Sequence, residues 1–176
     1  LANRIKANSG NNIIDGGSGV DTMIGGSGND SFFVDNNSDI VIEEQGGGFD
    51  FILSESDVFI LPKHIEILKL IGGSGSAGIG NASSNILVGS AANNSLAGLG
   101  GADSILGDAG DDTLDGGIDS EGDILKSSSP VSGGTILLGI VYDLSIQQSA
   151  DTMIGGAGSD KYIVDSQNDI VLESPL

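Results

Sequence analysis

Residues 16–24 read Gly16-Gly17-Ser18-Gly19-Val20-Asp21-Thr22-Met23-Ile24, and residues 25–33 continue without a gap as Gly25-Gly26-Ser27-Gly28-Asn29-Asp30-Ser31-Phe32-Phe33. Both stretches fit one nine-residue template, Gly-Gly-x-Gly-x-Asp-x-U-x, in which U is a large apolar residue. A third copy lies at 155–163. A short period of this kind is typical of solenoids, in which each repeat is one small unit that stacks on its neighbours.

Degenerate copies keep the same frame on either side of these repeats. The sixth position is Asp or Asn in three ladders of nine-residue steps: Asn3, Asn12, Asp21, Asp30 and Asp39; Asn85, Asn94, Asp103 and Asp112; Asp151, Asp160 and Asp169. The glycine-rich part predicts a tight turn, because Gly takes positive φ at little cost, and the remaining three residues predict a short strand. Alternation along that strand sends the apolar eighth residue inward. We therefore predict a narrow core between two parallel sheets, with two repeats in each turn.

On these repeats the chain resembles the RTX, or haemolysin-type calcium-binding, family of secreted bacterial proteins. The resemblance covers most of the chain. It implies an all-β fold, a right-handed parallel β-roll or β-solenoid of nonapeptide repeats, here with non-repeat strand insertions. It also implies several Ca²⁺ ions, each lying between two stacked turns and bound by sixth-position Asp side chains and by backbone carbonyls of positions one to four.

The carboxylate ladder also indicates calcium on physical grounds. Stacking places the Asp of one turn about 4.8 Å from the Asp or Asn of the next, and like charges at that distance repel each other. Ca²⁺ takes about 6 to 8 oxygen ligands in flexible geometry. The pairs that the resemblance implies are Asp21 with Asp39, Asp30 with Asn12, and Asp151 with Asp169. Asn12 and Asn94 offer only neutral oxygen, so we expect weaker or empty sites there.

The expected calcium ligands come from three parts of the chain. The first part supplies Asn12, Gly16, Gly17, Ser18, Gly19, Asp21, Gly25, Gly26, Ser27, Gly28, Asp30 and Asp39. The second supplies Gly98, Gly100, Asp103, Gly107, Ala109, Gly110, Asp112 and Asp123. The third supplies Asp151, Gly155, Gly156, Ala157, Gly158, Asp160 and Asp169.

Interruptions of the nine-residue frame divide the chain. We predict a first RTX block at 1–53, a strand-rich excursion at 54–79, a second block at 80–126, an insertion with a strand at 127–149, and a third block with an exit strand at 150–176. Apolar ninth-position residues of consecutive repeats form outward stripes: Ile24, Phe33, Ile42 and Leu53. We expect segments 54–70 and 135–146 to fold back over such stripes, or else a neighbouring repeat block or a second copy to cover them.

Composition excludes several classes of function. The chain has 176 residues with 6 Lys and Arg against 25 Asp and Glu, a net charge of −19 at pH 7. Such a chain offers no basic surface to nucleic acid. The absence of cysteine excludes disulfides and thiolate metal sites. The longest apolar run, at 136–142, is far shorter than the roughly 20 residues of a transmembrane helix.

Motifs for catalysis are weak, so we expect no enzyme activity. The GxGxxG at 73–78 is followed by no helix pattern, His64 is the sole histidine, and no GxSxG is present. The role we favour is a calcium-binding structural module that folds outside the cell after type I secretion. The alternatives are a self-assembling repeat segment of an adhesin, surface-layer or filament protein, and the C-terminal roll of a secreted lipase, protease or epimerase. Because Leu1 already lies in the repeat frame, we expect a piece of a longer protein.

Overall fold

The computed structural model describes residues 1–73, 76–101, 103–109 and 112–116, together with the backbone of further strands at 124–126, 135–137, 152–156 and 170–173. The described residues form short strands joined by turns, and no helix occurs among them. In this part of the chain there is consequently no helix with the length and hydrophobicity to cross a membrane.

Most strands follow the repeat frame, and most are three or four residues long. They are β1 (Arg4–Lys6), β2 (Ile13–Asp15), β3 (Thr22–Ile24), β4 (Ser31–Val34), β5 (Ile40–Ile42), β6 (Phe51–Ser54), β7 (Val58–Ile60), β8 (Ile67–Leu70), β9 (Ala77–Ile79), β10 (Ile86–Val88), β11 (Ser95–Ala97), β12 (Ser104–Leu106), β13 (Thr113–Asp115), β14 (Ile124–Lys126), β15 (Thr135–Leu137), β16 (Thr152–Gly156) and β17 (Ile170–Glu173).

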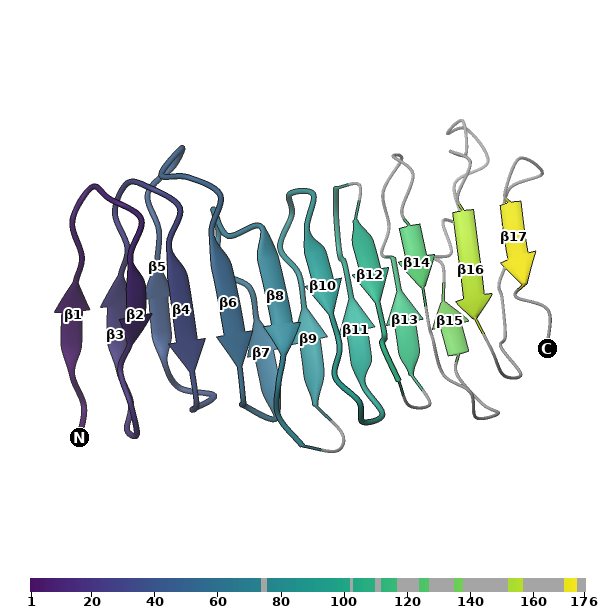
Figure 1. Cartoon of the computed structure of the whole chain (residues 1–176), viewed down its shortest axis with the longest axis horizontal. Coiled ribbons are helices and arrows are strands. Elements are labelled where there is room, and N and C mark those ends of the chain that lie inside the picture. The colour runs from purple at the N-terminus through teal and green to yellow at the C-terminus, as the bar shows by residue number, and fades with distance from the viewer. Residues whose placement is uncertain are drawn as a thin grey trace.

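From β1 to β16, successive strands alternate between the two faces of a flattened coil (Figure 1). One face is a nine-stranded sheet in the order β2-β4-β6-β8-β10-β12-β14-β16-β17. The other face consists of a three-stranded sheet, β1-β3-β5, and a five-stranded sheet, β7-β9-β11-β13-β15. All pairings are parallel, and a regular turn takes 18 residues, as Arg4 opposite Thr22 shows. The predicted parallel β-roll is confirmed.

The core consists mainly of a row of eighth-position side chains enclosed between the two faces, and Val34, Leu61, Ile65 and Leu70 add to it beside this row. The members of this row that the sequence predicted and that are buried are Ile14, Met23, Phe32, Val41, Leu87, Leu96, Ile105 and Leu114. Within a sheet these residues lie directly opposite one another, as Ile14 and Phe32 do in β2 and β4. Burial of this row supplies the hydrophobic stabilisation of the coil.

Segment 54–70 does not fold back over the outer faces, so that expectation is wrong. Its apolar residues continue the core row instead, with Phe59 and Leu68 buried. The step from Ser31 in β4 to Phe51 in β6 is 20 residues, and the step from Phe51 to Ile67 in β8 is 16. The two steps together equal two regular turns, so the lengthened turn is compensated by a shortened one and the stack continues. The strand at 135–137 likewise pairs with β13, and the rest of 135–146 lies outside the described residues.

The stripe residues therefore stay on the outside of the coil. Phe33 and Ile42 are exposed, whereas Ile24 and Leu53 are half-buried among their strand neighbours. The face that carries Ile42 is also interrupted, because β5 and β7 do not pair with each other. Figure 1 shows β5 and β7 farther apart than the neighbouring strands on either side.

Two adjacent phenylalanines of β4 test the assignment of the core. Phe32 is fully buried and Phe33 is 38% exposed, so truncation of Phe32 to Ala removes far more buried apolar surface than truncation of Phe33. We expect Phe32→Ala to lower the free energy of unfolding by about 3–5 kcal/mol, and Phe33→Ala to lower it by only about 1 kcal/mol. Urea unfolding in saturating calcium measures both. Equal losses would show that the inward row is assigned to the wrong residues.

Candidate metal centre

The turns of the coil gather the sixth-position side chains into one row along each edge. One row contains Asn12, Asp30, Asp50, Glu66, Asn85 and Asp103, and the other contains Asn3, Asp21, Asp39, Asn94 and Asp112. Five of the aspartates, Asp21, Asp30, Asp50, Asp103 and Asp112, are almost completely buried. Burial of so many acidic groups requires partners for them.

One hydrogen bond recurs along both rows. The Oδ1 atom of each sixth-position Asp accepts the backbone N–H of the sixth-position residue one turn earlier. Asn3 donates to Asp21 at 2.6 Å and Asp21 donates to Asp39 at 2.9 Å. On the other edge Asn12 donates to Asp30 at 2.7 Å. The structure thus brings together Asp21 with Asp39 and Asp30 with Asn12, the two predicted pairs that lie within the described residues. In each pair a backbone amide donates to a side-chain carboxylate.

In several of these side chains the second carboxylate oxygen is left without a hydrogen bond, whereas Asp39 Oδ2 accepts the Asn36 N–H at 3.2 Å. Oδ2 of Asp21, Asp30 and Asp50 is buried and has no partner, and the same is true of Glu43 Oε1. Buried polar atoms in native proteins are nearly always satisfied, so such atoms require an explanation. A cation held against these oxygens would satisfy them, and it would also offset the repulsion between the stacked carboxylates.

The first glycine of each repeat makes room for the carboxylate of the same repeat. A Cβ atom on Gly16 would lie 2.6 Å from Asp21 Oδ2, and one on Gly25 would lie 2.5 Å from Asp30 Oδ2. Gly98 and Gly107 stand in the same relation to Asp103 and Asp112. The template therefore pairs Gly at position one with Asp at position six because the two occupy one space.

Three carboxylates converge at one point on the first of these edges. Asp30, Glu43 and Asp50 each offer one oxygen, and these atoms all lie within 4.8 Å of one another. Asp30 immediately precedes β4, Glu43 immediately follows β5, and Asp50 immediately precedes β6. All three side chains are buried. Among the described residues, no other group of three His, Cys, Asp or Glu converges in this way.

Glu43 and Asp50 are missing from the ligands expected from the sequence. Asp50-Phe51-Ile52 repeats the Asp-x-U signature of Asp30, and recognising the frame on both sides of the insertion would have identified it. Glu43 carries no such signal, because it occupies the first position of a repeat, where the template has glycine. Its carboxylate fits because the residue one turn earlier is Gly25, where a Cβ would overlap Glu43 Oε1.

The electrostatics of this cluster favour protonation when no cation is present. Burial, with the charges of Asp50 and Asp30, raises the pKa of Glu43 to about 7. Burial also raises the pKa of Asp50. The hydrogen bond from the Asp30 N–H partly opposes this rise, and the charges of Glu66 and Asp30 add to it. In the folded chain Glu43 retains a proton that the unfolded chain loses near pH 4.5. Without calcium, the stability of the folded state therefore decreases as the pH rises from 4.5 to about 7.

The donor set fits a hard divalent cation. Every convergent atom is a carboxylate oxygen, and the chain contains no cysteine. Oxygen-only sites suit Ca²⁺ and Mg²⁺, and the flexible coordination of Ca²⁺ suits ligands that arrive from three separate turns. The amide of Asn94, in contrast, already has partners at both ends, since Oδ1 accepts the Ser90 N–H at 2.6 Å and Nδ2 donates to the Ser76 carbonyl at 3.3 Å.

The other expected ligands are placed as follows. Gly16, Gly17, Ser18 and Gly19 form the turn before Asp21, and Gly25, Gly26, Ser27 and Gly28 form the turn before Asp30. Gly98 and Gly100 lie in the turn before Asp103, and Gly107 and Ala109 lie in the turn before Asp112. Gly155 and Gly156 end β16. Gly110, Asp123, Asp151, Ala157, Gly158, Asp160 and Asp169 lie outside the described residues.

Proton release should accompany ion binding at the cluster. Because a bound cation requires ionised Glu43, lowering the pH from 8 to 6 is expected to weaken calcium binding at this site about tenfold. Glu43→Gln should bind more weakly than the parent chain at pH 8 and show a flatter pH dependence. Isothermal titration at both pH values measures this, with the exposed neighbour Glu44→Gln as the control. An unchanged pH dependence in Glu43→Gln would exclude Glu43 as a ligand.

Comparison with protein-family models matches the chain to the RTX calcium-binding nonapeptide repeat, in four copies that cover 1–32, 79–114 and 148–171. A search of curated proteins and a search of solved structures found no match. The matched ranges make up more than half of the chain and include the turns that carry Asp21, Asp30 and Asp103. The chain belongs to the RTX, or haemolysin-type calcium-binding repeat, family.

Proposed function

We propose that this β-roll is a calcium-dependent structural module of a secreted bacterial protein, which folds when it meets calcium outside the cell and has no catalytic activity of its own. RTX repeats bind calcium and are typical of secreted bacterial proteins. The observation that carries the proposal is the set of buried carboxylate oxygens without a partner at Asp21, Asp30, Glu43 and Asp50. These atoms oppose folding unless a cation joins them.

The energetics support folding that depends on calcium. Most strands contribute a single apolar side chain to the core, and the chain carries a net charge of −19, so burial must overcome substantial repulsion. An ion that binds only the folded chain stabilises it by about 2.7 kcal/mol per site at a hundredfold excess over Kd. Several such sites would contribute as much as the whole stability of a typical domain, about 5–15 kcal/mol.

A second role is supported by the outer faces of the coil. Phe33 on one face, and Ile42 and Ile60 on the other, expose large apolar side chains to solvent. Exposed apolar surface of this kind is often an interface. As the source of this chain, the exposed apolar surface favours a repeat segment of an adhesin, surface-layer or filament-forming protein over the C-terminal roll of a secreted lipase, protease or epimerase.

Removal of calcium tests the main proposal. We expect the far-ultraviolet circular dichroism spectrum to show β structure in millimolar calcium and a largely unfolded chain in excess chelator, because the partnerless carboxylates then repel one another. Magnesium at the same concentration serves as the control for ionic strength. The same β spectrum in chelator and in calcium would contradict the proposal.

A pair of isosteric substitutions separates ligands from other acidic residues. Asp30→Asn keeps the shape of a buried side chain but removes its charge, and should raise the calcium concentration at half-folding at least about tenfold. Asp35→Asn removes the same charge from an exposed turn residue and should leave the midpoint within about twofold. Equal shifts in the two variants would mean that the effect reflects net charge alone.

A further inference from the structure

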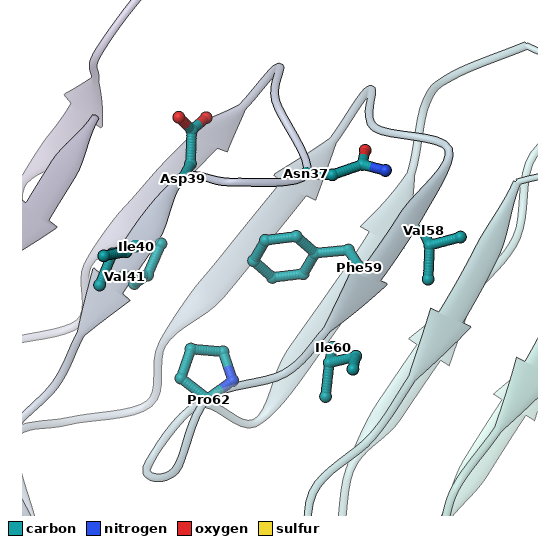
Figure 2. Close-up of a pocket in the computed structure, with 8 residues that line it drawn as sticks. All are labelled: Asn37, Asp39, Ile40, Val41, Val58, Phe59, Ile60 and Pro62. Atoms are coloured by element: carbon teal, nitrogen blue, oxygen red, sulfur yellow. The ribbon is translucent and has the colours of Figure 1, made fainter. Parts of the chain in front are cut away.

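The interruption between β5 and β7 contains a groove of about 410 Å³. Asn37 and Asp39 lie at the end where the two strands begin, and Pro62 lies where they end, as Figure 2 shows. The ring of Phe59 projects from β7 towards Val41 of β5. The floor of the groove is therefore apolar, and one end of it is polar and acidic.

The edge of β5 that faces the groove has backbone groups free of sheet pairing. The Ile40 N–H donates to the Asp21 carbonyl at 2.8 Å, and the Gly25 N–H donates to the Ile42 carbonyl at 3.3 Å. Residues 40 and 42 thus direct their backbone groups towards β3. Because these groups alternate along a strand, the N–H and C=O of Val41 face the groove.

The edge of β7 shows the complementary pattern. The Leu61 N–H donates to a carbonyl of β9 at 2.8 Å, and the Asp57 carbonyl accepts the first N–H of β9 at 2.8 Å. By the same alternation, Val58 and Ile60 direct their N–H and C=O groups into the groove. Unpaired edges on both sides are a template for one additional strand.

The side chains around the groove specify what such a strand would carry. Ile40, Val58 and Ile60 point outward and are 52%, 44% and 60% exposed. An inserted strand would place alternate side chains beside these residues, and the others inward over Phe59. β-Branched residues suit this environment because they pack well against cross-strand neighbours.

The charge around the groove favours a basic occupant over a second copy of the chain. The turns that lead into β5 and β7 carry Asp35, Asp39, Glu55 and Asp57, and residues 7–62 contain no Lys or Arg. A second copy would bring a further net charge of −19 to this acidic end. A strand with basic residues at the matching end would be attracted to it.

We propose that the groove between β5 and β7 binds an extended peptide segment of a partner protein, with basic residues at one end and alternating β-branched residues along its length. The segment completes the interrupted face of the coil by strand addition: its backbone pairs with Val41 on one side and with Val58 and Ile60 on the other. This function differs from calcium binding, with which it shares Asp39 at the acidic end of the groove.

The test uses the full chain, folded in saturating calcium, and a fluorescent peptide Lys-Lys-Val-Thr-Val-Thr-Val. Anisotropy should show saturable binding. Replacing the Val at the fifth position of the peptide by Pro removes a backbone donor and should weaken binding at least about tenfold, and replacing both Lys by Glu should weaken it similarly. No binding, or equal binding of all three peptides, would overturn the proposal. Because the assay starts from folded protein, its outcome does not depend on whether calcium controls folding.

Matched variants locate the site. Ile60→Asp places a charge beside the groove at a residue 60% exposed, and should abolish peptide binding; Ile13→Asp makes the same change in β2 at a residue 80% exposed, and should not. NMR amide exchange should slow at Val41, Val58 and Ile60 when the peptide is added. Equal binding by both variants would overturn the proposal, and so would concentration-dependent protection of these amides without peptide, which would identify a second copy as the occupant.

Discussion

The hydrogen bond from the backbone of one turn to the sixth-position carboxylate of the next is the contact on which the rest of the roll depends. It fixes Asp21 and Asp30 in buried positions at the edge of the coil and uses one oxygen of each. The other oxygen is left facing the space above the first-position glycine. The same side chain therefore serves both stacking and the candidate cation site, because the bond that sets the register leaves the second oxygen available as a ligand.

Most of the coil could be predicted because its determinants are local. A nine-residue period specifies turn, strand and inward residue within each repeat, so Met23, Phe32 and Leu96 are identified without knowledge of distant contacts. The pairing of Asp21 with Asp39 follows in the same way, since two repeats return the chain to the same edge.

The features that could not be predicted depend on how separate turns compensate one another. Segment 54–70 lacks the template, yet it stays in the stack because the long step to β6 is balanced by a short step to β8. That balance appears only once the neighbouring strands are paired. Glu43 was missed for a similar reason, since its position beside Asp30 and Asp50 depends on where the lengthened turn returns. The separation of β5 from β7 is also a relation between turns, and the sequence of a single repeat carries no signal for it.

The overlap between Gly25 and Glu43 has a consequence for how such rolls can change over time. The Glu43 carboxylate occupies the place that any side chain at residue 25 would fill, although 18 residues separate the two positions. An acidic side chain at residue 43 can take this position because residue 25 is glycine, and a side chain at residue 25 would displace the Glu43 carboxylate from Asp30 and Asp50. Residues 25 and 43 are therefore coupled, and two repeats one turn apart do not diverge independently at these positions.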